Sequence, residues 1–154
     1  MELGAAWSRD NRIDYVSGEL LPQAVLLTRL LVRQLNGDLS RTEAGMLNTL
    51  SGGPRRITEL AELEGLAQPT TTILVNQLEQ RGLVSRERAA HDGRVVLVHL
   101  NEAGRRALGN YRDQASALIG GVLTEMPDEQ LEALAEATAR LAGLVALLQQ
   151  GSAR

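Results

Sequence analysis

The sequence contains no cysteine, no lysine and no phenylalanine, and it has only one tryptophan and two tyrosines. Without cysteine, disulfide bonds, thiolate metal ligands and a cysteine-based redox switch are excluded. Without lysine, all sixteen cationic side chains are arginine, which is more economically explained by a GC-rich genome than by a function. So few aromatic residues could hardly line a ligand pocket. Two alternatives remain: a pocket lined by leucine and valine, or no pocket.

Long uncharged runs are also missing. The longest, such as 141–153, are too short to span a bilayer, and no signal peptide opens the chain. We therefore expect a cytoplasmic protein with no membrane partner. Its 154 residues are enough for one domain with a real core.

Motifs of enzymes and metal proteins are missing too. The sequence has two histidines, His91 and His99, but no cysteine and no well-placed carboxylates that could complete a metal site with them. We therefore expect no metal site. The Gly-rich turn 51–54 lacks the Gly-Lys-Ser/Thr ending of a phosphate loop, and no carboxylate pair or nucleophile motif stands out. The sequence therefore predicts a protein without enzymatic activity and without a cofactor.

Charge is distributed unevenly, although the net charge is only -3. Segment 81–106 holds six arginines against three acidic residues, whereas segment 125–150 holds five acidic residues against one arginine. A basic segment beside an acidic tail fits a protein that meets a polyanion on one side, but excesses of this size also occur in proteins that bind none.

Strongly apolar helices are predicted near both ends of the chain. After a loose arm over 1–12, leucines and valines cover most of a helix over about 17–35, with Pro22 in its first turn and Asn36-Gly37 at its end. A long helix follows Asn101, with glycine interruptions, and another follows Pro127. Their apolar coverage exceeds what one small domain can bury, which favours an obligate dimer of interlocked helices.

Segment 40–101 carries the pattern of a winged helix-turn-helix. Ser40 and Glu43 have capping-box spacing before a helix to about Leu50, and Thr58 is predicted to cap a short helix that Gly65 ends. Strands are expected over 83–88 and 95–100, around a short polar wing loop, 89–93.

The helix from Gln68 to about Arg81 is the one we expect in a DNA groove. Its predicted inner positions are Thr71, Leu74, Val75 and Leu78. Its outer face carries hydroxyl and amide groups that can read base edges, and no acid before Glu79. The outer residues are Pro69, Thr70, Thr72, Ile73, Asn76 and Gln77.

These features resemble the MarR family of bacterial transcription regulators over nearly the full chain. The matching segments are 39–43, 58–61, 70–79, 81–84 with Arg86, 92–94, 96–98 with Leu100, and 102–104. The most specific of them is the run Leu-Glu-x-x-Gly-Leu-Val-x-Arg, from Leu78 to Arg86, followed by Asp92-Gly-Arg94 and a hydrophobic strand.

The resemblance implies a mainly α protein with a small antiparallel β wing, forming one domain over residues 1–154. Dimerisation helices are expected over about 14–36 and 102–150, and the winged helix-turn-helix lobe over about 40–101. The implied function is that of a homodimeric regulator, expected to be a repressor, that binds a pseudo-palindromic DNA operator and often responds to a small-molecule effector.

By the same resemblance, Asp92 supports the wing, Arg94 enters the minor groove, and the outer face of the 68–81 helix meets the major groove. The full set of expected DNA-binding residues is Gln68, Pro69, Thr70, Thr72, Ile73, Asn76, Gln77, Arg86 and Arg94. Arg86 fits a phosphate contact or a structural role better than base reading.

Ile73 departs from the family pattern, since many members carry arginine there. Either Ile73 contacts thymine methyl groups or it faces inward. A rival interpretation of the whole chain is a winged-helix module that uses the same face to bind a protein and does not bind DNA.

Overall fold

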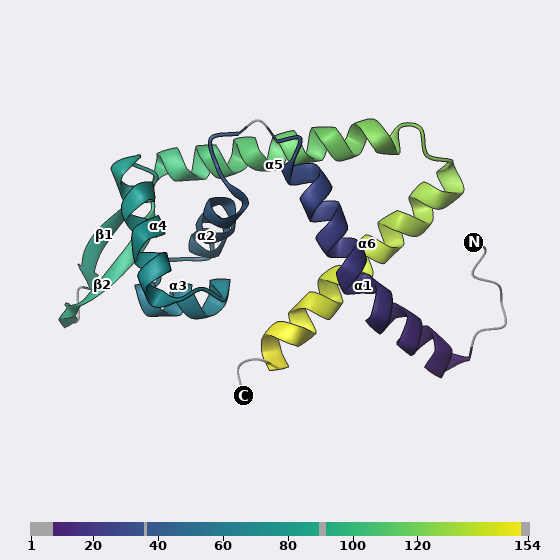
Figure 1. Cartoon of the computed structure of the whole chain (residues 1–154), viewed down its shortest axis with the longest axis horizontal. Coiled ribbons are helices and arrows are strands. Elements are labelled where there is room, and N and C mark those ends of the chain that lie inside the picture. The colour runs from purple at the N-terminus through teal and green to yellow at the C-terminus, as the bar shows by residue number, and fades with distance from the viewer. Residues whose placement is uncertain (1–7, 36, 90–91, 152–154) are drawn as a thin grey trace. The chain divides into compact units, whose positions relative to one another are not determined.

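The computed structural model describes residues 8–35, 37–89 and 92–151 (Figure 1). These residues form six helices and one two-stranded antiparallel sheet, in the order α1-α2-α3-α4-β1-β2-α5-α6. The predicted mainly α class with a small β wing is confirmed. The chain divides into two compact units, Met1–Ala115 and Ser116–Arg154. In the part of the chain that is described, no helix has both the length and the apolar character that crossing a membrane requires.

Helix α1, Arg9–Val32, begins earlier than the sequence pattern predicted. The Ser8 hydroxyl caps it by accepting a hydrogen bond from the Asn11 amide at 3.1 Å. The predicted loose arm is therefore wrong for residues 9–12, and the prediction for residues 1–7 lies outside the described residues. Pro22 lies inside the helix and not in its first turn, so the helix lacks one of its backbone hydrogen bonds there.

The end of α1 also differs from the prediction. The helix stops at Val32, with Arg33 as its C-cap, and not at the Asn36-Gly37 pair. Asn36 lies outside the described residues. The Arg33 and Leu35 amides still donate to the carbonyls of the last turn, so the turn that follows the helix satisfies these acceptors without a glycine.

Helix α2, Arg41–Ser51, has the capping box that the sequence predicted. The Glu43 amide donates to the Ser40 hydroxyl at 3.2 Å, and the Ser40 amide donates to the Glu43 carboxylate at 2.7 Å. Two amides that an uncapped helix would leave without a partner are thereby satisfied. The inward positions include the predicted Ala44, Leu47 and Leu50, all buried.

Helix α3, Ile57–Glu64, starts at a different cap from the predicted one. Arg56 is the N-cap, and its amide donates to the Glu59 carboxylate at 2.9 Å; Thr58 is already helical. Gly65 ends the helix in the left-handed conformation, with φ of 63°, which glycine adopts without a Cβ penalty.

Helix α4, Gln68–Gln80, leads directly into the hairpin. Gly82, with φ of 70°, ends it as predicted. Strands β1, Val84–Ala89, and β2, Asp92–Leu100, pair antiparallel with Val84 opposite Leu100 and an irregularity between Arg88 and Ala89. Ala89, Asp92 and Gly93 belong to the strands and not to the predicted loop 89–93. The other two residues of that loop lie outside the described residues.

A single hydrophobic core holds the helix-turn-helix and the hairpin together. It joins α2, α3, α4, both strands and the start of α5. Its side chains that are most completely buried are Met46, Leu47, Leu60, Leu78, Val75, Val84 and Val98. Arg55 adds a backbone bridge to Val98, so the segment between α2 and α3 is attached to the hairpin. This framework fixes how α4 is presented.

Helices α5, Glu102–Leu123, and α6, Asp128–Gly151, complete the chain. The interruptions predicted in α5 at Gly109 and at 120–121 are wrong, since the helix runs through all three glycines. An isolated glycine weakens a helix by only about 1 kcal/mol relative to alanine, which the rest of a long helix offsets. Gly104 is buried at the start of α5, where α5 passes close to the backbone of Leu83.

Candidate nucleic-acid interface

Helix α4 has one buried face and one open face. Thr71, Val75 and Leu78 are fully buried on the core side, as the sequence predicted. The hydroxyl of Thr71 donates to the Ala67 carbonyl at 3.2 Å, which satisfies the polar atom that burial would otherwise leave without a partner. The orientation of α4 about its own axis is therefore fixed by three core contacts.

The predicted outer residues of α4 lie on the open face. We call this surface the α4 face. Its exposed members are Gln68, Pro69, Thr70, Ile73, Asn76 and Gln77, and Thr72 is half-buried. The Thr72 hydroxyl donates to the Gln68 carbonyl at 2.9 Å, and its oxygen can still accept from outside. The structure thus brings seven of the predicted residues together on one helix.

Ile73 belongs to this open face, because 58% of it is exposed. Val75, two residues further along the helix, is fully buried, and residues two apart on a helix do not share a face. The alternative that placed Ile73 in the core is wrong. A large apolar side chain therefore lies in the middle of a polar surface.

Negative charge is kept off the α4 face. The first acidic residue of α4 is Glu79, near the C-terminal end of the helix. The guanidinium of Arg86 pairs with the Glu79 carboxylate, with Nη1 2.5 Å from Oε2. The Arg86 amide donates to the other carboxylate oxygen at 3.1 Å. Both oxygens are thus occupied, which lowers the repulsion that a free carboxylate would exert on a phosphate backbone.

Arg86 also reaches Asn76 on the α4 face, with Nη2 2.6 Å from Oδ1. Its side chain is 24% exposed. Arg86, which the sequence predicted as a contact residue, is therefore attached to the α4 face. A guanidinium has five N–H donors, so these two bonds leave others available for DNA. Direct contact between Arg86 and DNA stays a prediction.

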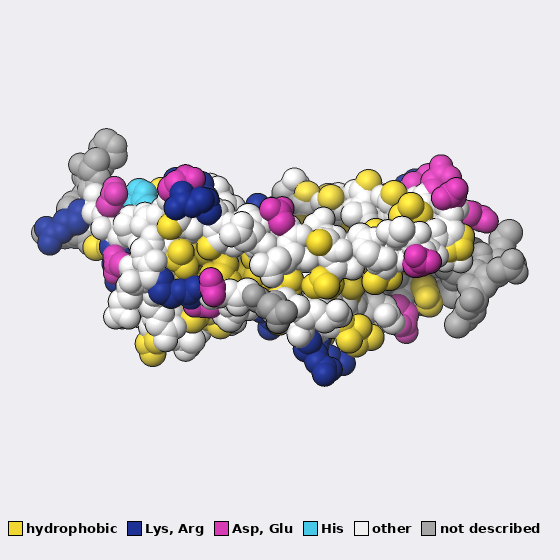
Figure 2. Space-filling model, turned by 90° about the horizontal axis from the view of Figure 1, so that it is seen from above, with side chains coloured by type: hydrophobic (Ala, Val, Ile, Leu, Met, Phe, Trp, Pro, Cys, Tyr) yellow, Lys and Arg dark blue, Asp and Glu magenta, His cyan; other side chains and the backbone are white. Residues whose placement is uncertain are grey.

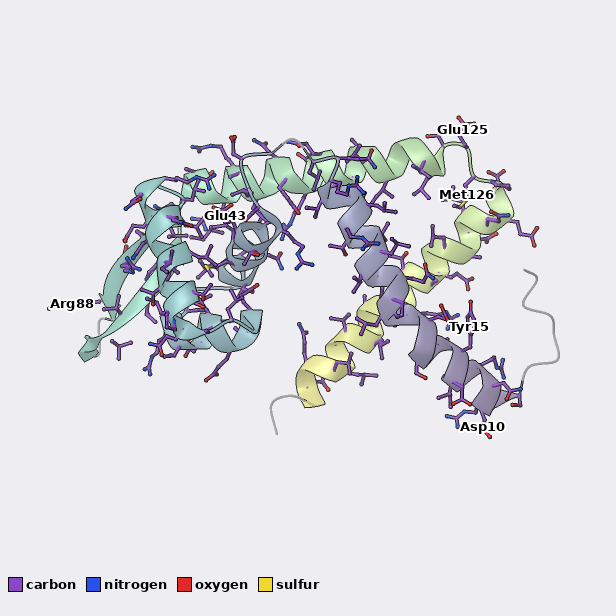
Figure 3. The ribbon with its side chains drawn as sticks, viewed as in Figure 1. Asp10, Tyr15, Glu43, Arg88, Glu125 and Met126 are labelled. Carbon is purple, nitrogen blue, oxygen red and sulfur yellow. The ribbon has the colours of Figure 1, made fainter. Side chains whose placement is uncertain are left out.

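The hairpin carries the predicted wing residues at its outer end. Asp92 and Arg94 both lie in β2, and their side chains are outside the described residues, so their roles stay predictions. Figure 3 shows Arg88 on the hairpin, where it is exposed. The positive charge that the sequence concentrates in 81–106 thus lies partly on the element next to α4.

Two residues that hold α4 in place were not predicted as site residues. Glu79 restrains Arg86, as described above, and Arg81 ties the C-terminal end of α4 to α2. Arg81 donates to the Glu43 carboxylate at 2.7 Å and to the Asp38 carbonyl at 2.6 Å. Glu43 lies in the first turn of α2 (Figure 3). The partners are 38 and 43 residues from Arg81, so no local sequence pattern could have identified them.

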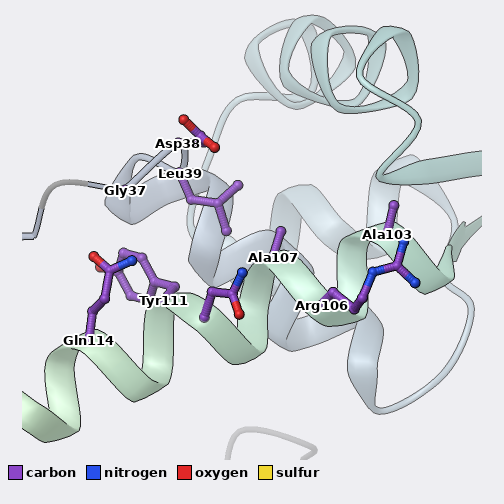
Figure 4. Close-up of a pocket in the computed structure, with 9 residues that line it drawn as sticks. Gly37, Asp38, Leu39, Ala103, Arg106, Ala107, Tyr111 and Gln114 are labelled. Atoms are coloured by element: carbon purple, nitrogen blue, oxygen red, sulfur yellow. The ribbon is translucent and has the colours of Figure 1, made fainter.

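A pocket of about 280 Å³ lies between the segment before α2 and the first half of α5 (Figure 4). Its apolar wall is built from Leu39, Ala103, Ala107 and Tyr111. Polar groups complete the lining, contributed by Asp38, Arg106, Asn110 and Gln114. This wall contains no valine, so the pocket differs from the leucine- and valine-lined pocket that was one of the alternatives from the sequence. Over the described residues, no group of three His, Asp or Glu side chains is placed to hold a metal ion.

Comparison with known sequences points to one family. A family model described as "MarR family" matches residues 37–95, which include α2, α3, α4, β1 and the start of β2. The chain is also 27% identical over 108 residues to YpoP of Bacillus subtilis, an uncharacterized HTH-type transcriptional regulator. That match covers 70% of this chain and 77% of YpoP.

Solved structures share the fold over most of the chain. A MarR family protein from Bacillus stearothermophilus matches with a TM-score of 0.70 and 24% identity, over 91% of this chain and 99% of that one. RV1404 from Mycobacterium tuberculosis matches with a TM-score of 0.74 and 21% identity, over 92% and 97%. At these identities the likeness establishes the fold and confirms the winged helix-turn-helix architecture.

Proposed function

Because the chain belongs to the MarR family of DNA-binding transcriptional regulators, we propose that it acts as a homodimeric repressor that reads a pseudo-palindromic operator. Each copy places α4 in a major groove and the tip of its hairpin in the neighbouring minor groove. In a two-fold dimer the two copies of α4 meet successive major grooves about 34 Å apart.

The α4 face is the observation that carries this proposal. It offers side-chain hydroxyl and amide groups on a helix whose other side is anchored in the core. Such groups pair with base edges in the major groove. Glu79, the one acidic residue of α4, has both carboxylate oxygens engaged by Arg86, which lowers its repulsion of a phosphate backbone.

Ile73 supplies the apolar part of base reading in this proposal. Its exposed side chain takes the place where many family members carry arginine, so a guanine-reading donor is replaced by methyl groups. Contact with the C5-methyl group of thymine is the interaction that suits it. We therefore expect the operator to carry thymine at the base pair that Ile73 faces.

Arg94 supplies the minor-groove contact, and Asp92 supports the wing around it. Both roles rest on the family pattern and on the position of these residues in β2, next to the hairpin turn. A minor groove that is narrow, as in A-tracts, has an enhanced negative potential that attracts arginine. The preferred operator should thus contain A·T base pairs outside each half-site.

The surfaces of the terminal helices support the homodimer. Hydrophobic side chains reach the surface of the molecule (Figure 2). On α1, Ile13, Val16, Leu21, Val25 and Leu27 are each at least half exposed. Complete burial of one such side chain stabilises by about 1.5–3 kcal/mol, so covering this surface of α1 with a second copy favours a dimer.

The pocket beside α5 is our proposed effector site. Its volume of about 280 Å³ lies just below the range of roughly 300–1,000 Å³ typical of ligand pockets, which suits a small molecule. Arg106, Asn110 and Gln114 offer donors, while Leu39 and Tyr111 offer apolar contact. Thermal stabilisation of the protein by a panel of metabolites, compared with a Tyr111→Ala variant, tests this assignment.

The proposed function is tested by selecting genomic fragments with the purified protein and measuring their retardation. We expect an enriched inverted repeat and binding that weakens steeply as salt rises, because arginine contacts to phosphate dominate the affinity. No retardation at micromolar protein and low salt would favour the rival protein-binding module. In vitro transcription from the selected promoter then distinguishes repression from activation.

A further inference from the structure

The contact between Arg86 and Asn76 has a consequence for base recognition. Arg86 is on β1 and Asn76 is on the α4 face, ten residues earlier in the chain. Nη2 of Arg86 lies 2.6 Å from Oδ1 of Asn76. The guanidinium therefore meets the side chain that, on an isolated helix, would be free to present either end of its amide.

The direction of this amide is dictated by chemistry. Arginine has N–H donors and no acceptor, whereas the two ends of an asparagine amide are an acceptor oxygen and a donor nitrogen. Only the oxygen of Asn76 can face Arg86. The nitrogen, with its two N–H groups, is on the other branch of the amide, and Asn76 as a whole is exposed.

Glu79 makes Arg86 a fixed partner. The carboxylate pairs with Nη1, and Nη2 is left for Asn76. The same carboxylate accepts from the Arg86 backbone amide at 3.1 Å. One acidic side chain on α4 thus holds both the backbone and the head group of Arg86, and the planar guanidinium spans two partners at once.

We propose that Arg86 is a positioning residue for specificity: it fixes the direction of the Asn76 amide, so that the amide presents its N–H groups to the DNA. This inference rests on the proposed function, in which the α4 face meets base edges. Asn76 then reads an acceptor in the major groove at the place where adenine carries its N6 donor, which is guanine O6 or thymine O4.

Adenine is the base that this arrangement disfavours. Asparagine recognises adenine through a bidentate contact that uses the oxygen as acceptor and the nitrogen as donor. In this protein the bond to Arg86 takes one of the two lone pairs of the oxygen and fixes the direction of the amide, so the amide is not free to turn into the bidentate geometry. Each half-site should contain one position at which guanine or thymine is preferred and adenine is not.

Selection of operator variants by wild type and by Arg86→Met tests the proposal. Methionine keeps an aliphatic stem but has no N–H donor. We expect the variant to gain about tenfold in preference for adenine at one position of each half-site, as bidentate contact becomes available. Arg86→Lys is the second variant, chosen to keep a cation for Glu79; its one ammonium does not span both partners, and the same shift is expected.

Two controls separate positioning from a general effect. Arg88→Met, two residues along the same strand, should lower affinity evenly for all sequences and leave the preferred base unchanged. In an Asn76→Ala background, Arg86→Met should no longer alter base preference, because its effect passes through Asn76. An equal shift with and without the Asn76 side chain would overturn the proposal.

A measurement without DNA keeps this inference separate from the proposed function. The side-chain N–H₂ resonances of Asn76 should shift in Arg86→Met and stay in place in Arg88→Met. If wild type binds no DNA, the proposed function fails, whatever these resonances do. If wild type selects an operator but Arg86→Met and Arg86→Lys select the same base as wild type, the proposed function stands and the role of Arg86 is overturned.

Discussion

Arg81 and Glu43 form an ion pair that joins the end of α4 to the start of α2, with Nη1 2.7 Å from Oε1. The Glu43 side chain is only 13% exposed, and its other oxygen belongs to the capping box of α2. One carboxylate thus connects the C-terminal end of α4 with the first turn of α2.

Replacing Arg81 with methionine should therefore destabilise the lobe. A hydrogen bond to a charged group contributes about 1.5–3 kcal/mol, and partial exposure of Arg81 reduces this, so we expect a loss of about 1–2 kcal/mol. Urea unfolding measures it. Arg105→Met is the matched control, because the pair of Arg105 with Glu102 is exposed on both sides; an equal loss in both variants would contradict a special role for Arg81.

Gly104→Ala should be strongly destabilising. A Cβ at this position would lie 2.2 Å from the carbonyl oxygen of Leu83 and 2.6 Å from a methyl carbon of Leu100. Since the nearest atom is backbone, the clash requires α5 to shift, and overpacking of this kind costs about 1–3 kcal/mol or more. Thermal unfolding should show a clearly lower Tm.

Gly109→Ala is the control for that substitution on the same helix. A Cβ at Gly109 would meet nothing within 4 Å, and alanine favours a helix over glycine by about 0.5–1 kcal/mol. We expect Gly109→Ala to be neutral or stabilising. A similar loss of stability in both variants would mean that the close approach at Gly104 is not the cause.

Ile73→Ala should weaken operator binding without affecting the fold. With 58% of Ile73 exposed, the change in unfolding free energy should stay within about 0.5 kcal/mol. Loss of thymine contact should weaken operator binding by about fivefold. An operator with deoxyuridine at the matching position removes only the methyl group: wild type should lose affinity on it, and Ile73→Ala should not.

Arg94→Ala tests the wing. Removing the minor-groove arginine should weaken binding at physiological salt and lower the salt dependence by roughly one phosphate-equivalent. The change should be larger for operators with A·T-rich flanks, whose narrow minor groove attracts arginine. Equal affinity of wild type and Arg94→Ala at physiological salt would remove Arg94 from the interface.

Sequence patterns predicted the features that depend on near neighbours in the chain. The capping box of α2 involves residues three apart, Ser40 and Glu43, and Gly82 ends α4 with its own backbone conformation. The inner and outer faces of α4 follow from helical periodicity, which identified Thr71, Val75 and Leu78 as buried. The start of α1 was missed because the apolar pattern begins well after its cap, Ser8.

Sequence patterns could not predict the features that depend on tertiary contacts. The outward direction of Ile73 required the position of α4 against the core. The link from Arg86 to Glu79 and Asn76 depends on β1 folding back beside α4, and the pair of Arg81 with Glu43 joins residues 38 apart. Leu63 illustrates the same limit in α3, since it is an apolar residue and is nevertheless 63% exposed.

The central claim, that the α4 face reads DNA sequence, is tested most directly by a triple variant, Thr70→Ala/Thr72→Ala/Gln77→Ala. Its affinity for the selected operator and for scrambled DNA of equal length is compared with that of wild type at matched salt. We predict that the variant folds normally, binds scrambled DNA as wild type does, and no longer prefers the operator. A variant that keeps the full operator preference of wild type would contradict the account.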